Sequence, residues 1–171
     1  NEQTEIGILL ALPGLLATLA FGPLILELFY SKAFSPAAEL MPYFILGVFG
    51  RVVSWPLGFI QLAKGSSRLF MLTETATIFL WLGLVVVLVP VVGVVGTAYA
   101  FALIYFLYTL ATLGLGRVLI GFRWSRTVKR LLFMSTGIVA LTFILTLMTN
   151  RWVANVGGGL LTLVGDRKST R

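Results

Sequence analysis

The sequence predicts an all-α protein, a polytopic bundle of transmembrane helices with about five full spans, and three observations lead to this fold class. The residue types A, V, I, L, M, F, W, Y and C make up 58% of the chain, only 11% of residues are charged, and the mean hydropathy is +1.01. Soluble domains are about 45–50% apolar and about 25% charged. The apolar residues also fall into runs of roughly 20, the length that spans the hydrocarbon core as a helix. A soluble fold would lack the polar side chains to cover its surface, so lipid is the expected solvent.

The first two predicted spans are long and contain prolines. The first covers residues 5–30 and includes Pro23, and a polar connection at 31–36 ends it. The second covers residues 38–63 and includes Pro56. Proline is tolerated in a membrane helix where neighbouring groups satisfy the freed carbonyl, so neither proline excludes a span.

Three more spans follow at 69–89, 94–116 and 131–148. An uncharged turn at 90–93 separates the third span from the fourth. The most polar stretch of the chain, 117–130, separates the fourth span from the fifth. These two separators are predicted to lie on opposite sides of the membrane, because one helix joins them.

The end of the chain does not fit a further span. The apolar stretch 152–164 is too short to cross the membrane as a straight helix, so we expect a truncated sixth helix or a re-entrant or interfacial segment. The predicted division is therefore a transmembrane bundle at 1–150 and a short apolar segment with a basic tail at 151–171. The chain begins with Asn1-Glu2-Gln3 and no initiator Met, so we expect a fragment of a longer transporter.

Lys and Arg are concentrated in alternate connections, which predicts the orientation. The basic residues of these connections are Lys64, Arg68, Arg117, Arg123, Arg126, Lys129 and Arg130. Cytoplasmic loops of membrane proteins carry such an excess, so the amino end and both basic connections are expected in the cytoplasm. The same placement explains the net charge of +7 without nucleic acid, which we do not expect as a partner.

Several kinds of chemistry have no residues to support them. The chain has no Cys and no His, which removes a thiolate metal site, the commonest general base and the commonest transition-metal ligand. It contains no phosphate-binding loop motif, and its connections are too short to hold a catalytic domain. We therefore expect no enzyme, no catalytic residue, no metal and no cofactor.

Arg51 is the strongest candidate for a functional residue. It lies near the middle of the second predicted span, where a charge costs at least about 2.5–3.5 kcal/mol on insertion scales. Trp55 and several small residues share its helical face. A guanidinium offers a planar fork of donors that suits a phosphate group, so Arg51 and Trp55 are candidate substrate-binding residues. The alternative is that Arg51 pairs with a carboxylate for packing alone.

Glu74, near the start of the third span, is the natural carboxylate to consider. It is a candidate charge partner of Arg51 or a site of ion coupling, and its shallow depth also allows it to reach the interface. Gln61 and Lys64 would extend a polar track from Arg51 towards the cytoplasmic side, although Lys64 is better explained as an ordinary loop lysine.

The basic segment 117–130 has two interpretations. Its cations Arg117, Arg123, Arg126, Lys129 and Arg130 would anchor the chain at the membrane surface, either by holding anionic headgroups or only by setting topology. Small residues at Gly93, Gly96 and Ala100 permit close helix packing. Tyr99, Tyr105, Tyr108 and Trp81 would line a sugar-binding cavity or pack helices together.

Several stretches, in order over residues 1–148, carry a family resemblance. They are Asn1-Glu2-Gln3 with Pro13, LFYS at 28–31 with Phe34, RVVSWPLG at 51–58 with AKG at 63–65, GVVGTAYA at 93–100 with Tyr105, and GFRWS at 121–125. In these stretches the chain resembles the C-terminal portion of Wzx-type O-antigen translocases, which belong to the multidrug/oligosaccharidyl-lipid/polysaccharide exporter superfamily. Members of that superfamily have two lobes of helices and work by alternating access.

The resemblance implies a function and its partners. The expected activity is the flipping of an undecaprenyl-diphosphate-linked oligosaccharide from the inner to the outer face of the bacterial plasma (inner) membrane, for O-antigen or a related surface polysaccharide. The implied partners are this lipid-linked oligosaccharide, membrane lipids, the missing first lobe, a polysaccharide polymerase and a chain-length regulator. The alternatives are a multidrug exporter of the same superfamily, a membrane-embedded polymerase, or an accessory subunit.

Overall fold

The computed structural model describes the chain at residues 1–29 and 35–166, and the side chains at 1–22, 24–26, 28–29, 37 and 39–149. The described chain is helical and contains no strand, which confirms the predicted fold class. The helices are α1 (Glu2–Phe29), α2 (Ser35–Ala63), α3 (Ser67–Val92), α4 (Val95–Ile120) and α5 (Arg126–Asp166). All 5 are long and apolar enough to cross a membrane.

The helices extend beyond the predicted spans, and the connections are correspondingly shorter. The turn predicted at 90–93 is shorter in the structure, because Pro90 lies inside α3, which continues to Val92. The polar stretch 117–130 is mostly helical as well, since only residues 121–125 lie outside α4 and α5. Apolar runs mark the part of a helix that lies in hydrocarbon, whereas the backbone hydrogen bonds continue into the polar end turns. The predicted connection at 31–36 lies mainly outside the described residues.

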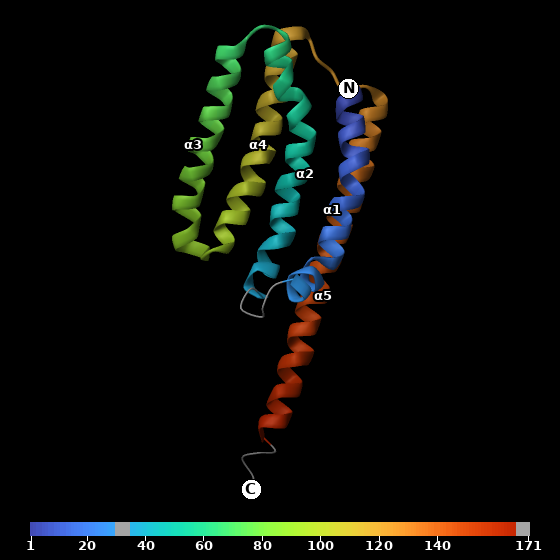
Figure 1. Ribbon diagram of the computed structural model, residues 1–171, viewed down its shortest axis with the longest axis vertical. Coiled ribbons are helices and arrows are strands. Elements are labelled where there is room, and N and C mark those ends of the chain that lie inside the picture. The colour runs from blue at the N-terminus through green and yellow to red at the C-terminus, as the bar shows by residue number, and fades with distance from the viewer. Residues whose placement is uncertain (30–34, 167–171) are drawn as a thin grey trace.

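The C-terminal stretch at 152–164 is helical and continues α5 without a break. The fifth membrane span is the part of α5 from Arg126 to Thr149, and the helix then runs past the end of the bundle (Figure 1). The expected short apolar segment is therefore part of α5 and not a separate element. The end of the expected basic tail, 167–171, lies outside the described residues.

Two glycines allow the helices to reverse direction within short turns. Gly93 ends α3 with a φ of 74°, and Gly121 ends α4 with a φ of 65°. A side chain with a β-carbon rarely adopts this left-handed region, so glycine is the expected residue at both helix ends. Gly93 and Val94 alone connect α3 to α4, which forces these two helices to lie side by side.

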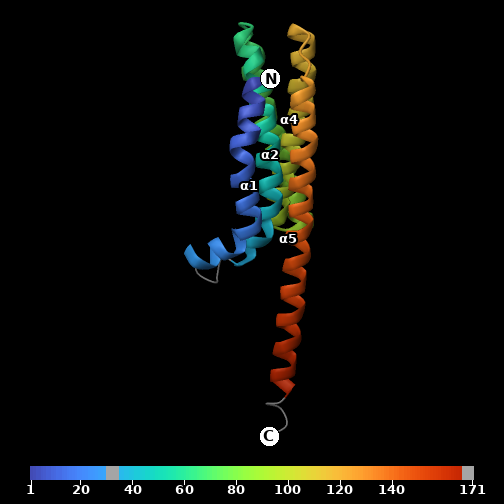
Figure 2. The same ribbon diagram turned by 90° about the vertical axis from the view of Figure 1, so that its right-hand side faces the viewer.

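The spatial order of the helices differs from their order in the sequence. They pack as α3–α4–α2–α1–α5, and α2 is the central helix because it contacts all four of the others. Figures 1 and 2 show the resulting flat bundle, in which α5 lies behind α1 and the last part of α1 turns away from the bundle axis. Pro23 belongs to this last part of α1, and proline cannot donate the hydrogen bond that would keep a helix straight.

The apolar contacts form two different interfaces. Leu15 and Leu19 of α1, Ile45 of α2 and Val139 of α5 make one buried cluster. On the other side of α2, glycines face the large side chains of α4, and a β-carbon built at Gly50 would lie 3.2 Å from Cβ of Tyr105. No residue of α3 is buried, so its apolar surface is available to lipid.

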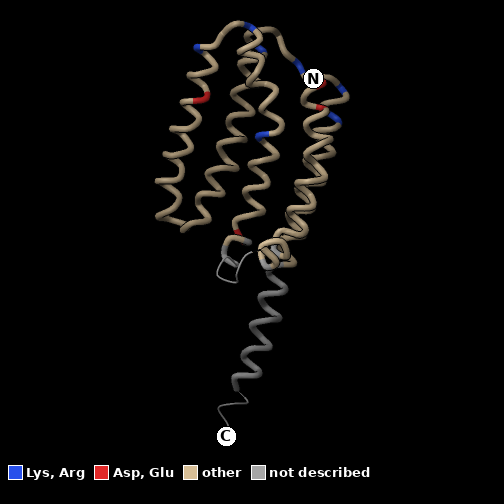
Figure 3. Tube along the Cα trace, viewed as in Figure 1, with Lys and Arg blue, Asp and Glu red and all other residues tan. Residues whose placement is uncertain are grey.

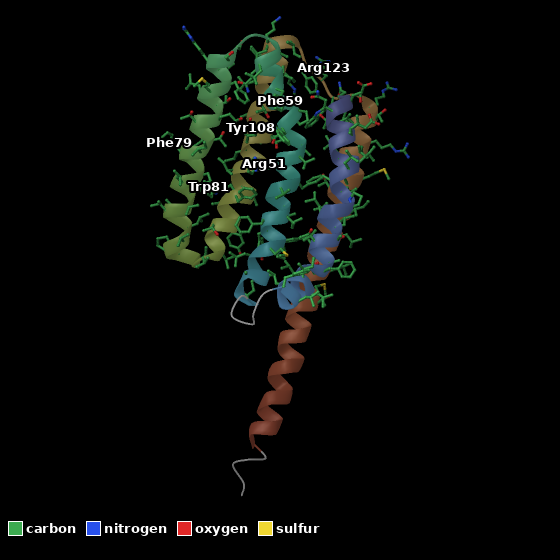
Figure 4. The ribbon with its side chains drawn as sticks, in the orientation of Figure 1. Arg51, Phe59, Phe79, Trp81, Tyr108 and Arg123 are labelled. Carbon is green, nitrogen blue, oxygen red and sulfur yellow. The ribbon has the colours of Figure 1, made fainter. Side chains whose placement is uncertain are left out.

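Basic residues gather at one end of the bundle (Figure 3). The amino terminus, the turn between α2 and α3, and the loop between α4 and α5 all lie at this end. Among the cations whose side chains the structure describes, Arg51 is the exception, because it lies on α2 well removed from the basic end (Figure 4). The alternation read from the sequence therefore corresponds to a real charge asymmetry along the bundle axis.

Candidate functional site

Arg51 projects from α2 next to α4, at mid-bundle depth (Figure 4). Its guanidinium carbon lies 5.7 Å from the centroid of the Tyr105 ring, which is a cation–π distance. The side chain is nevertheless exposed on the surface of the described bundle. An exposed guanidinium at this depth needs water or another protein body around it, because hydrocarbon would not solvate it.

Arg51 has no carboxylate partner among the described residues. Glu74, which we considered for this role, accepts a hydrogen bond from the hydroxyl of Tyr108 instead. Glu74 lies on α3, whose main neighbour is α4, so the tyrosine of α4 reaches it before the arginine of α2 does. The structure therefore does not form an Arg51–Glu74 pair.

A polar cluster joins α2, α3 and α4 between Arg51 and the basic end. The hydroxyl of Thr73 donates to Oε1 of Gln61 over 3.2 Å, and Glu74 follows Thr73 on α3. Gln61 is only 1% exposed, and its side-chain Nε2 has no hydrogen-bond partner in the described structure. A buried amide N–H without an acceptor is costly, so a hydrogen-bond acceptor brought within its reach would stabilise this position.

Tyr105 and Tyr108 connect Arg51 to this cluster. Their ring centroids lie 6.2 Å apart at an interplanar angle of 75°. A β-carbon at Gly58 would lie 2.8 Å from the Tyr108 hydroxyl, so a glycine here lets the tyrosine reach across α2 towards Glu74. From the sequence, both tyrosines were predicted only as sugar-cavity or packing residues, and these contacts were not predicted. Their spacing of three residues on α4 was the available signal, because it places both rings on one helical face.

Trp55 and Lys64 do not join this group. Trp55 is 61% exposed, packs near Phe59 with 6.1 Å between ring centroids, and lines a surface hollow of about 560 Å³ together with Gln3. Lys64 is exposed in the turn after α2. The proposed continuous track from Arg51 through Gln61 to Lys64 is therefore absent from the described structure, since Gln61 is buried between helices.

The remaining predicted residues surround the loop between α4 and α5. Arg117 lies in the last turn of α4, Arg123 in the loop, and Arg126, Lys129 and Arg130 in the first turns of α5. All five are exposed at the basic end of the bundle. No separate amphipathic helix forms here, because α4 and α5 together take up most of the segment.

The described residues include no group of three or more Asp or Glu side chains that could hold a metal ion. Comparisons of the chain with protein-family models, with curated proteins and with solved structures find no match.

Proposed function

We propose that this chain forms one helical lobe of a transporter that flips an undecaprenyl-diphosphate-linked oligosaccharide from the inner to the outer face of the bacterial plasma membrane. The observation that carries the proposal is the environment of Arg51, a mid-bundle guanidinium that is exposed and has no described carboxylate partner. The resemblance to Wzx-type translocases supplies the substrate class. The activity is transport, with no covalent chemistry.

The energetics of Arg51 support a water-filled cavity between two protein bodies. A guanidinium facing hydrocarbon would cost at least about 2.5–3.5 kcal/mol, and no described carboxylate offsets this. A cavity closed by a first lobe would keep Arg51 hydrated while the substrate is absent. The missing lobe is therefore the main protein partner in this proposal, and the polymerase and chain-length regulator would act on the exported glycan.

The contact with Tyr105 favours an anionic ligand. A cation–π contact contributes about 0.5–2 kcal/mol, depending on desolvation. It does not supply hydrogen-bond acceptors to the guanidinium N–H groups, so these donors still need a partner. All five N–H donors of Arg51 are free of described acceptors, so they are available to a diphosphate. A cationic drug would be repelled at this position, which disfavours the multidrug alternative.

The charge asymmetry of the bundle supports the orientation. With the basic end in the cytoplasm, the amino end and the loop between α4 and α5 lie on the side where the lipid-linked substrate is made. Glu74 and Tyr108 then lie on the cytoplasmic side of Arg51, and we assign Glu74 as the candidate for ion coupling.

The test uses the full gene that encodes this segment, in a strain that lacks its own translocase and makes a matching repeat unit. We expect Arg51→Ala to insert normally, to lose most surface polysaccharide, and to accumulate lipid-linked intermediate on the cytoplasmic face. Arg51→Lys keeps the charge without the planar fork and should restore only part of the activity. Arg126→Ala, which removes an exposed arginine at the basic end, is the control and should transport normally.

Two results would contradict the proposal. If Arg51→Ala restores surface polysaccharide as well as the wild type does, Arg51 is structural and the diphosphate assignment fails. If the wild type is expressed and inserted but restores none, the translocase assignment itself fails.

A further inference from the structure

A polar hollow lies at the basic end of the bundle, around the loop between α4 and α5. Its volume is about 500 Å³, and three cations line it: Arg117 from the end of α4, Arg123 from the loop, and Lys129 from α5. Trp124 and Gly121 complete much of the wall. Figure 4 shows Arg123 in this loop, at the opposite end of the bundle from the projecting part of α5.

The loop is held in place by hydrogen bonds on each side. Gly121 N–H donates to the carbonyl of Arg117 over 2.9 Å, which closes α4 with a left-handed glycine cap, and Phe122 N–H donates to the carbonyl of Gly116 over 3.1 Å. The side-chain oxygen of Asn1 accepts a hydrogen bond of 2.9 Å from Ser125 N–H. The cations are therefore presented by a fixed backbone, and a ligand would not have to order the loop first.

The charges in this hollow are not compensated. No described carboxylate pairs with Arg117, Arg123 or Lys129. Three like charges around one hollow repel each other, so an anion there would relieve this repulsion. Trp124 adds an indole N–H that is buried and has no acceptor in the part of the chain that the structure describes.

The amino end of α5 adds to the positive potential. The helix begins at Arg126, next to the hollow, and its first backbone N–H groups carry the partial positive charge of the helix dipole. The hydroxyl of Ser125 caps one of them by accepting from Val128 N–H over 3.1 Å. Phosphate groups bind readily at such helix ends when basic side chains are also present.

We propose that this hollow, lined by Arg117, Arg123, Trp124 and Lys129, is a binding site for the phosphate group of an anionic ligand at the membrane surface. Its position at the basic end places it at the level of the lipid headgroups. Either an anionic phospholipid or a soluble phosphate compound can present this group. The site is separate from Arg51, and its existence does not depend on the transport function proposed above.

The test compares charge-matched double variants of this chain, purified in an uncharged detergent. Arg117→Gln with Arg123→Gln removes two cations from the hollow, whereas Arg126→Gln with Arg130→Gln removes two nearby arginines that do not line it. Retention of phosphatidylglycerol is measured by native mass spectrometry. We expect the first double variant to lose affinity by about tenfold or more, since charge-assisted hydrogen bonds are lost, and the second to change less than about twofold.

Two more measurements identify the source of the ligand and distinguish a loss of binding from a loss of folding. Competition by inorganic phosphate or pyrophosphate would assign the site to the phosphate group itself, and its absence would assign the site to the complete lipid headgroup. Trp124→Phe keeps an aromatic side chain and all the charges but removes the indole N–H together with part of the ring, and it should weaken retention by a few fold. Equal loss of retention in both double variants, or equal retention of neutral lipid by the wild type, would overturn the proposal.

Discussion

At the scale of single residues, the contacts of Arg51 and Glu74 differ from those of a simple ion pair. Arg51 lies over the ring of Tyr105, and Glu74 accepts from Tyr108. Both acidic and basic groups therefore interact with tyrosines of α4, and these tyrosines contact each other edge-on. The arrangement leaves the guanidinium N–H groups free and gives the carboxylate a donor within the protein.

The Tyr108–Glu74 hydrogen bond is testable by a double-mutant cycle. Tyr108→Phe removes the donor but keeps the ring, so Glu74 loses its partner, and we expect the free energy of unfolding to fall by about 1–3 kcal/mol. Combining it with Glu74→Leu should cost less than the sum of the single variants, with a coupling of about 1 kcal/mol. Unfolding in mixed detergent micelles provides the measurement, and additive effects would show that the two groups do not interact.

At the scale of the helices, small residues decide which elements approach closely. Gly96, near the start of α4, is buried, and a β-carbon there would lie 2.8 Å from the backbone carbon of Leu88 in α3. The backbone of α3 cannot move aside as a flexible side chain would. The spacing of Gly93, Gly96 and Ala100 predicted close packing, and the structure identifies α3 as the neighbour at Gly96.

Two alanine substitutions in α4 should have opposite effects. Gly96→Ala places a methyl group against the backbone of α3 and should destabilise the bundle by about 1–3 kcal/mol, as overpacking does. Gly114→Ala meets nothing within 4 Å and should stabilise the helix by about 0.5–1 kcal/mol, because alanine loses less backbone entropy. Thermal unfolding of both variants in the same detergent checks the signs. Stabilisation by Gly96→Ala would contradict the α3–α4 packing.

At the scale of the whole molecule, the described Lys and Arg residues gather at one end of the bundle, and the final helix runs past the other end. Two parts of the bundle surface require different surroundings, as the exposed Arg51 and the unburied α3 indicate. The face that carries Arg51 requires water or protein, whereas the apolar surface of α3 suits lipid. The bundle is therefore chemically suited to act as one part of a larger membrane assembly.

The topology can be tested directly because the sequence contains no cysteine. Single substitutions Ser67→Cys and Thr127→Cys lie at the basic end, and Val94→Cys lies in the turn at the other end. We expect a membrane-impermeant maleimide to label Val94→Cys in intact cells, and the other two only after the membrane is opened. Labelling of all three positions from one side would exclude the five-span topology.

The sequence by itself determined the fold class, the approximate spans and the alternation of basic connections. Each of these depends on local hydropathy, helix length or glycine at a turn, and such properties are determined by residues that are close together in the sequence. Arg51 was identifiable for the same reason, since a charge inside an apolar run is visible without any neighbour. The helix ends were less predictable, because hydrogen bonding continues beyond the apolar residues, as at Pro90 and Arg117.

Only the tertiary structure decided which side chains meet. The packing order α3–α4–α2–α1–α5 places Tyr105 beside Arg51 and Tyr108 beside Glu74, and it leaves Trp55 and Lys64 outside this group. It also shapes the basic hollow from the ends of α4 and α5. The physical reason is that one apolar helix surface resembles another in composition, so the choice of neighbour depends on the fit of glycines against large side chains across helices distant in sequence.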